Sequence, residues 1–118
     1  MGGKKSRNKG HAFEREIARV FRPYFPEAKR GFQTRGGTNE EPDVKGTPWY
    51  IECKRMRRCN PLAALRQAEE ALYETDEEGT RRKDPRPPLA ICKNDREKAT
   101  VTLYLDDFMN MVDRIYEK

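Results

Sequence analysis

The residues best suited to chemistry lie in one short stretch, residues 42–54. It reads PDVKGTPWYIECK, so two acids, Asp43 and Glu52, come shortly before Lys54. Side chains alternate along a strand, which puts Glu52 and Lys54 on one side and Ile51 on the other, toward a core. A short hairpin in the same stretch would return Asp43 beside Glu52.

This pattern predicts phosphodiester hydrolysis. Two carboxylates side by side repel each other, and a divalent cation removes that repulsion. The cation would also neutralise the attacked phosphate, while a lysine beside the nucleophilic water would orient it or stabilise developing charge. Oxygen ligands suit Mg²⁺ and equally Mn²⁺. The alternative is an ordinary Glu–Lys pair at a sheet edge, since the ExK spacing alone is common.

Composition limits the classes of protein that need considering. The 118 residues suit one domain, and 38% of them are charged. We expect no membrane span and no secretory signal, because no apolar run is long enough. Three cysteines without framework spacing indicate reduced thiols and a cytoplasmic protein, in the host cytoplasm if a phage encodes it. The lone His11 argues against structural zinc and against a histidine general base.

Positive charge is concentrated in the first half of the chain. Residues 1–66 hold sixteen Lys and Arg against seven Asp and Glu. Such a half attracts nucleic acid phosphate, although a solvated basic surface would look the same. We expect residues 1–10 to form a basic flexible arm and residues 11–118 one domain. The proposed phosphate contacts in the arm and after the ExK motif are Lys4, Lys5, Arg7, Lys9, Arg55, Arg57 and Arg58.

Hydrophobic periodicity predicts an α/β domain with a mixed central sheet flanked by helices. A helix is expected over residues 11–21, and a second one is capped by Asn60 with Pro61 at its first position. A charged, exposed connection should follow it. The predicted strands cover 28–34, 42–45, 49–54, 89–93 and 99–105; the connection covers 74–88, and a last helix 106–116.

The Pro-Asp and Glu-Cys-Lys elements resemble the signature of PD-(D/E)xK superfamily nucleases. Within that superfamily the chain is similar to archaeal-type and phage Holliday junction resolvases. The resemblance implies a restriction-endonuclease-like core. The similar stretches occur in the same order as in that family: KGHAFERE at 9–16, RGGT at 35–38, residues 42–54, and PLAICK at 88–93.

The resemblance also implies roles for individual residues. The catalytic set would be Glu14, Asp43, Glu52 and Lys54. The metal would be held by Asp43, Glu52 and the Cys53 backbone carbonyl, with Glu14 as a further ligand or a partner of the metal's water. Helix geometry alone does not choose Glu14 over Glu16. The implied DNA contacts are Arg15, Arg35, Thr38 and Lys93. The dense arginine run after Lys54 and the long connection at 74–88 depart from the archaeal pattern.

The leading hypothesis is therefore a Mg²⁺-dependent Holliday junction resolvase acting on branched DNA as a homodimer. Two matched nicks in a two-fold symmetric junction require two active sites. Another PD-(D/E)xK nuclease of repair, nicking or restriction type is the nearest alternative. A non-catalytic nucleic-acid-binding module is a third, which leaves the acidic residues unexplained. For the dimer interface we consider the last helix; its stripe could instead cover the domain's own sheet. The stripe comprises Met109, Met111, Val112, Ile115 and Tyr116.

Overall fold

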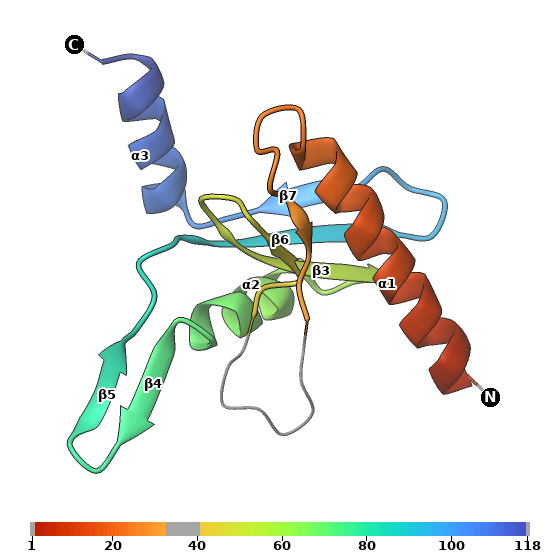
Figure 1. Ribbon diagram of the computed structural model, residues 1–118, viewed down its shortest axis with the longest axis horizontal. Coiled ribbons are helices and arrows are strands. Elements are labelled where there is room, and N and C mark those ends of the chain that lie inside the picture. The colour runs from red at the N-terminus through yellow and green to blue at the C-terminus, as the bar shows by residue number, and fades with distance from the viewer. Residues whose placement is uncertain (1, 33–40, 118) are drawn as a thin grey trace.

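The computed structural model describes residues 2–32 and 41–117, with side chains from residue 8 onward. It confirms a mixed α/β architecture with a mixed central sheet. The five strands lie in the order β1-β2-β3-β6-β7 (Figure 1). The two long central strands run parallel, and every other neighbouring pair is antiparallel. The strands are β1 (Lys29–Arg30), β2 (Val44–Lys45), β3 (Tyr50–Met56), β6 (Pro88–Asn94) and β7 (Thr100–Thr102).

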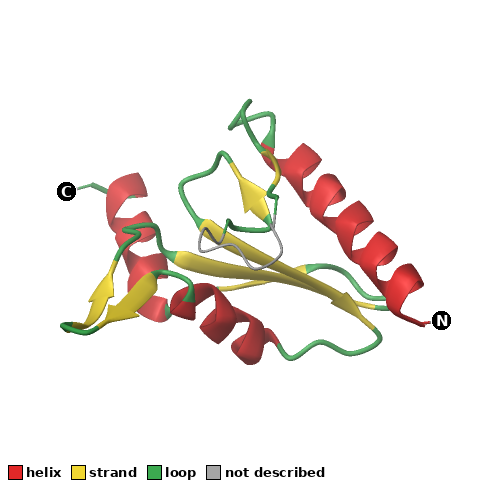
Figure 2. Ribbon diagram, turned by 60° about the horizontal axis from the view of Figure 1, so that its bottom comes forward, coloured by secondary structure: helices red, strands yellow, loops and turns green. Residues whose placement is uncertain are grey.

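Two helices cover opposite faces of this sheet. Figure 2 shows α1 (Gly2–Phe21) above the long strands and α2 (Pro61–Glu70) below them. The predicted start of the second helix is confirmed, because the Asn60 side chain accepts a hydrogen bond from the Ala63 N–H at 3.1 Å. No helix in the described part of the chain is long and apolar enough to cross a membrane.

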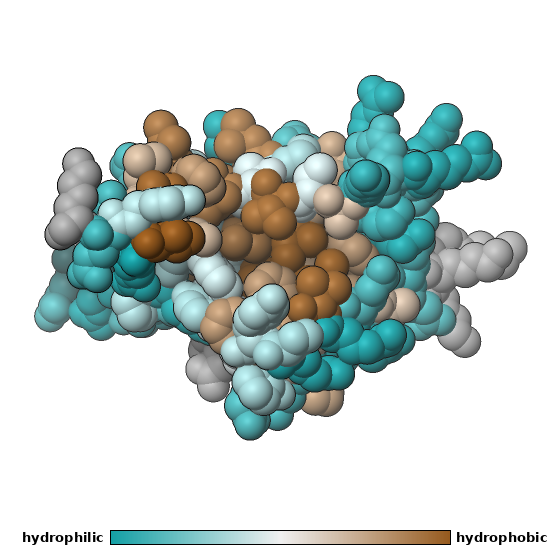
Figure 3. All heavy atoms as spheres, turned by 90° about the horizontal axis from the view of Figure 1, so that it is seen from above, coloured by the Kyte–Doolittle hydropathy of each residue, from teal (hydrophilic) through white to brown (hydrophobic). Residues whose placement is uncertain are grey.

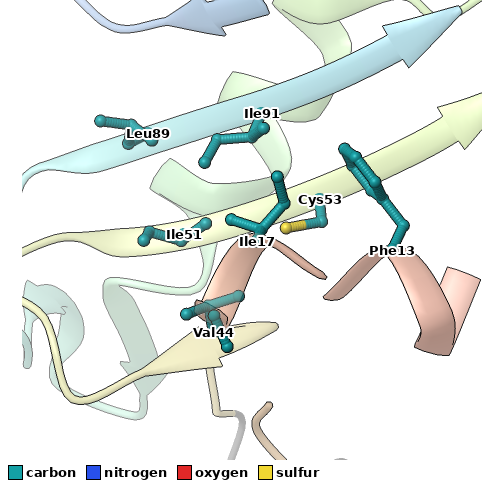
Figure 4. Packing of buried hydrophobic residues seen from close by; sticks show 8 residues of the cluster. Phe13, Ile17, Val44, Ile51, Cys53, Leu89 and Ile91 are labelled. Atoms are coloured by element: carbon teal, nitrogen blue, oxygen red, sulfur yellow. The ribbon is translucent and has the colours of Figure 1, made fainter. Parts of the chain in front are cut away.

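The core lies on both sides of β3. On the α1 side, apolar residues of α1, β2, β3 and β6 interdigitate (Figure 4). They include Phe13, Ile17, Val44, Ile51, Cys53, Leu89 and Ile91. On the α2 side, Leu65 packs near Ala90 and Cys92, and Leu72 packs with Tyr50. A charged residue within β3 is therefore placed in a largely desolvated environment, which raises the cost of its charge.

Two glycines allow β1 and the β2–β3 hairpin to approach closely. Gly46, in the hairpin turn, has a φ of +84°, and a Cβ there would collide with the Glu27 carbonyl. A Cβ on Gly31 would collide with the Pro42 carbonyl. The Gly31 N–H donates to the Asp43 carbonyl at 2.9 Å. These contacts fix the backbone that carries Asp43.

The first helix is longer than predicted and includes residues 2–10, where a basic flexible arm was expected. The first helix begins at Gly2, so residues 2–10 continue it, nine residues before the predicted start. The segment contains no proline, and extending an anchored helix is far easier than nucleating one. Lys9 also fixes this part of the helix, since its Nζ lies 2.7 Å from Asp95 Oδ1. The side chains of Lys4, Lys5 and Arg7 lie outside the described part.

The predicted connection at 74–88 is exposed but not unstructured. It contains most of a hairpin formed by β4 (Tyr73–Asp76) and β5 (Gly79–Arg82), which makes a separate two-stranded sheet. Cross-strand pairs stabilise this hairpin. Arg81 Nε lies 2.8 Å from Glu74 Oε1, and the Thr75 and Thr80 hydroxyls are 2.8 Å apart. These pairs are polar, so hydrophobic alternation did not reveal the strands.

The last helix, α3 (Leu105–Ile115), stands apart from the body of the molecule (Figure 1). None of its residues is buried. The alternative that its apolar stripe covers the domain's own sheet is therefore wrong. One side of the helix, with Asp107, Asn110, Met111 and Arg114, lines an open groove beside Trp49 and Pro87. Met111 and Val112 are half-buried, whereas Met109, Ile115 and Tyr116 of the stripe are exposed.

Candidate active site

The β2–β3 hairpin brings Asp43 and Glu52 together, as their spacing predicted. Val44 pairs with Ile51, so Asp43 lies opposite Glu52 at the end of this ladder. The Asp43 N–H donates to the Ile51 carbonyl at 2.8 Å, and the Cys53 N–H donates to Asp43 Oδ2 at 2.8 Å. Both carboxyl-bearing residues are buried, with exposed fractions of 5% and 6%. The backbone of β3 therefore fixes one Asp43 oxygen and leaves the pair in a protected site.

Burial makes this pair difficult to ionise fully. It raises the pKa of Asp43, against the opposing effects of the Cys53 N–H and Glu52. It also raises the pKa of Glu52 to about 8, followed in importance by repulsion from Asp43. Lys54 opposes the Glu52 shift, since its Nζ lies 3.4 Å from Glu52 Oε1. At neutral pH the pair therefore retains a proton, which a bound cation would displace.

Glu14 approaches the pair from α1. Burial, and then the charge of Asp43, raise the pKa of Glu14. The described side chains contain no group of three or more carboxylate, thiol or imidazole ligands arranged for a metal. The charge of Asp43 therefore affects the pKa of Glu14, but the two carboxylates are not part of such a group arranged for a metal. The structure also does not bring Glu16 into the pair's surroundings; its side chain is exposed.

Arg30 is a residue of this site that sequence reasoning missed. Its Nε lies 2.8 Å from Glu14 Oε2 in a half-buried pair, and its charge also lowers the pKa of Asp43. The only sequence signal was a basic residue in a weak strand. Glu14 and Arg30 meet because β1 packs against α1, a contact that periodicity alone does not predict. Arg30 therefore anchors the Glu14 carboxylate beside the acidic pair.

Oxygen chemistry at this site fits a hard divalent cation. Asp43 and Glu52 offer two buried carboxylates, and the Cys53 carbonyl follows directly in the backbone. The Cys53 thiol is no ligand here, because it faces the core and burial raises its pKa further. A cation would remove the repulsion that raises the Glu52 pKa. The donor set therefore suits Mg²⁺ or Mn²⁺ better than a soft metal.

The predicted DNA contacts fall in different places. Arg15 is exposed on α1 beside Glu14, and Lys93 is half-buried on β6 in register with Arg55. Lys9 is engaged with Asp95, and the two arginines at 57 and 58 are exposed just beyond β3. Arg35 and Thr38 lie in 33–40, outside the described residues.

Comparison with known proteins adds no relative. No family model matches the chain, and no curated protein or solved structure matches it.

Proposed function

We propose that this protein is a metal-dependent endonuclease of the PD-(D/E)xK type, with a restriction-endonuclease-like core. The observation that carries the proposal is the buried Asp43–Glu52 pair with Lys54 Nζ 3.4 Å from Glu52. Three charged groups converge on a segment that is otherwise core. Burying charged groups in this way costs stability, and such a cost is typical of a site that binds a ligand or carries out a reaction.

In this mechanism, Asp43, Glu52 and the Cys53 carbonyl would hold Mg²⁺, and a bound Mg²⁺ would supply Lewis-acid activation of water and phosphate. Lys54 stabilises charge that develops on the attacked phosphate, and its proximity to Glu52 keeps its ammonium directed at the site. Glu14 adds negative charge next to Asp43, and Arg30 fixes its carboxylate. The other side chains of β3 exclude water from behind the pair.

The substrate we propose is branched DNA, above all the four-way junction. The support is the resemblance to Holliday junction resolvases together with the basic residues around the site. Purified protein with Mg²⁺ should be offered a four-way junction, a duplex, a flap and a single strand in parallel. We expect paired symmetric nicks in the junction. Equal cutting of the plain duplex would favour a repair, nicking or restriction-type nuclease. Binding without cleavage would favour a non-catalytic nucleic-acid-binding module.

We further propose that the active form is a homodimer that pairs through α3. The helix exposes large apolar residues, including Leu105 at 72% and Ile115 at 70%. Hydrophobic residues gather between α3, at the left, and α1 (Figure 3). A helix this short is marginal in water without packing. Most of its large apolar side chains are exposed, which is opposite to the usual orientation of a surface helix.

Light scattering at micromolar concentration tests this pairing. The wild-type chain should be a dimer. Replacing two exposed apolar residues of α3, Phe108→Asp (47% exposed) with Ile115→Asp, should give a folded monomer. Leu62→Asp is the matched control, because Leu62 is 46% exposed but lies on α2, on the other face of the sheet (Figure 2). A strictly monomeric wild-type chain that still makes paired nicks would reject the dimer without rejecting the nuclease.

A further inference from the structure

A basic hollow lies at the far end of the sheet, where the parallel strands β3 and β6 both end. Its lining comes from two loops, one after β3 and one between β6 and β7. The lining residues are Arg57, Arg58, Asn94, Asp95, Arg96 and Glu97. Lys9, Arg55 and Lys93 lie beside it, so six cationic side chains and two carboxylates share this end of the sheet.

Both carboxylates are already engaged by neighbours. Lys9 Nζ lies 2.7 Å from Asp95 Oδ1, and the pKa of Asp95 is lowered by this bond and by nearby Arg55 and Lys93. The Asn94 amide donates to Glu97 Oε2 at 2.8 Å. By contrast, none of the three arginines lining the hollow has a hydrogen bond or ion pair with any described residue. The hollow therefore presents guanidinium groups whose donors remain available.

The two loops are also fixed to each other. The Cys59 N–H donates to Asn94 Oδ1 at 2.7 Å, and the Asp95 N–H donates to the Met56 carbonyl at 3.1 Å. The Cys59 thiol contacts the Lys93 carbonyl at 3.6 Å. Backbone and side-chain bonds thus hold the arginines of one loop next to the arginine of the other. A site fixed in this way loses less conformational entropy when a ligand binds.

Arg96 is in a conformation that a long side chain rarely adopts. Its φ is +65°, and it is the only non-glycine residue with a positive φ in the described ranges 2–32 and 41–117. Glycine or asparagine would occupy this turn position with less strain. Local strain of this kind persists where a side chain serves a function. The turn therefore does not by itself favour a long basic side chain at position 96.

We infer that Arg57, Arg58 and Arg96 form a second phosphate-binding site, which takes the sugar–phosphate backbone of the nucleic acid away from the cleavage site. Guanidinium groups bind phosphate oxygens in a bidentate way, and three of them close together suit a polyanion better than a single anion. Five residues of strand separate Glu52 from Arg57, a span of about 16 Å. This matches about five nucleotides at 3.4 Å each along one strand.

The inference rests on the proposed nucleic-acid substrate but not on cleavage, so it can be tested without catalysis. The affinity of the full chain for a four-way junction should be measured in EDTA by fluorescence anisotropy across a salt series. The triple variant Arg57→Gln, Arg58→Gln, Arg96→Gln should reduce the slope of log affinity against log salt by roughly 2 to 3. From that slope, affinity should fall on the order of 100-fold at 0.15 M salt.

The single variant Arg96→Gly separates binding from folding. Its urea midpoint should equal or exceed that of the wild type, because glycine relieves the positive φ, while affinity falls about fivefold. Arg66→Gln is the charge-matched control, since Arg66 is exposed on α2, outside both the hollow and the helix proposed for pairing. Unchanged affinity in Arg96→Gly, or an equal loss in Arg66→Gln, would overturn the site. Cleavage in Mg²⁺ is measured in a separate experiment. The binding result in EDTA can therefore be interpreted even if the protein does not cleave DNA.

Discussion

The buried acidic pair should make the metal-free protein less stable as the pH rises. Glu52 has an ordinary pKa of 4.5 when unfolded and about 8 when folded. Between these values the folded chain holds a proton that the unfolded chain has released. Stability therefore falls with increasing pH across this window and is unaffected by Glu52 below about pH 4.5. The direction is opposite to that of an ion-paired carboxylate.

The magnitude follows from the size of the shift. One proton changes the free energy of unfolding by at most about 1.4 kcal/mol per pH unit. The full shift of the Glu52 pKa therefore changes it by at most roughly 5 kcal/mol. A small domain is stable by only about 5–15 kcal/mol, so the change is measurable. Asp43 and Glu14 also have raised pKa values, so they add a pH dependence of the same sign, whereas Asp84 and Asp95 have lowered pKa values and act only below about pH 4. Burial raises the pKa of Cys92 to about 11, so this thiol acts above the window.

Urea unfolding followed by fluorescence of Trp49, the single tryptophan, provides the assay. The free energy of unfolding should be measured in EDTA from pH 5 to pH 8.5. Glu52→Gln should reduce the slope, because the amide keeps the shape without titrating, and the smaller slope that remains comes from Asp43 and Glu14. Saturating Mg²⁺ should stabilise the wild type more at pH 8 than at pH 5. An equal slope in Glu52→Gln would contradict the raised pKa of Glu52, as would a wild-type free energy of unfolding that rises across the window.

Three further changes probe the rest of the site. Because Arg30 positions Glu14, Arg30→Gln should lower the cleavage rate roughly 10–100-fold with little change in DNA affinity. Arg30→Lys should recover part of the lost rate. Single-turnover kinetics measure both rates. Lys54→Gln should slow cleavage by roughly 100-fold or more while binding stays within tenfold. Gly46→Ala should destabilise the fold by about 1–3 kcal/mol in urea unfolding, whereas Gly10→Ala, which meets open space within α1, should stabilise it slightly.

The strand alternation of residues 50–54 was enough to predict which side chains face the core. Ile51 and Cys53 are buried against α1, and Asp43 returns opposite Glu52 because the hairpin is short. The Asn60 cap was readable because its chemistry is local. Local patterns therefore predicted the central part of the site.

Other features depend on contacts that no local pattern encodes. The Arg30–Glu14 pair needs the packing of β1 on α1, and the Lys9–Asp95 pair joins residues 86 positions apart. The β4–β5 hairpin is held by polar pairs, so it has no hydrophobic signature. The stripe on α3 was visible in the sequence, but the exposure of most of its side chains was not.

The central claim is that Asp43 and Glu52 hold the metal for phosphodiester hydrolysis. Its most direct test measures junction cleavage and junction binding side by side for the wild type and Asp43→Asn, with Mg²⁺ and with excess chelator. We predict cleavage only by the wild type with Mg²⁺, while Asp43→Asn binds the junction with nearly wild-type affinity. Full cleavage by Asp43→Asn, or by the wild type in chelator, would contradict it.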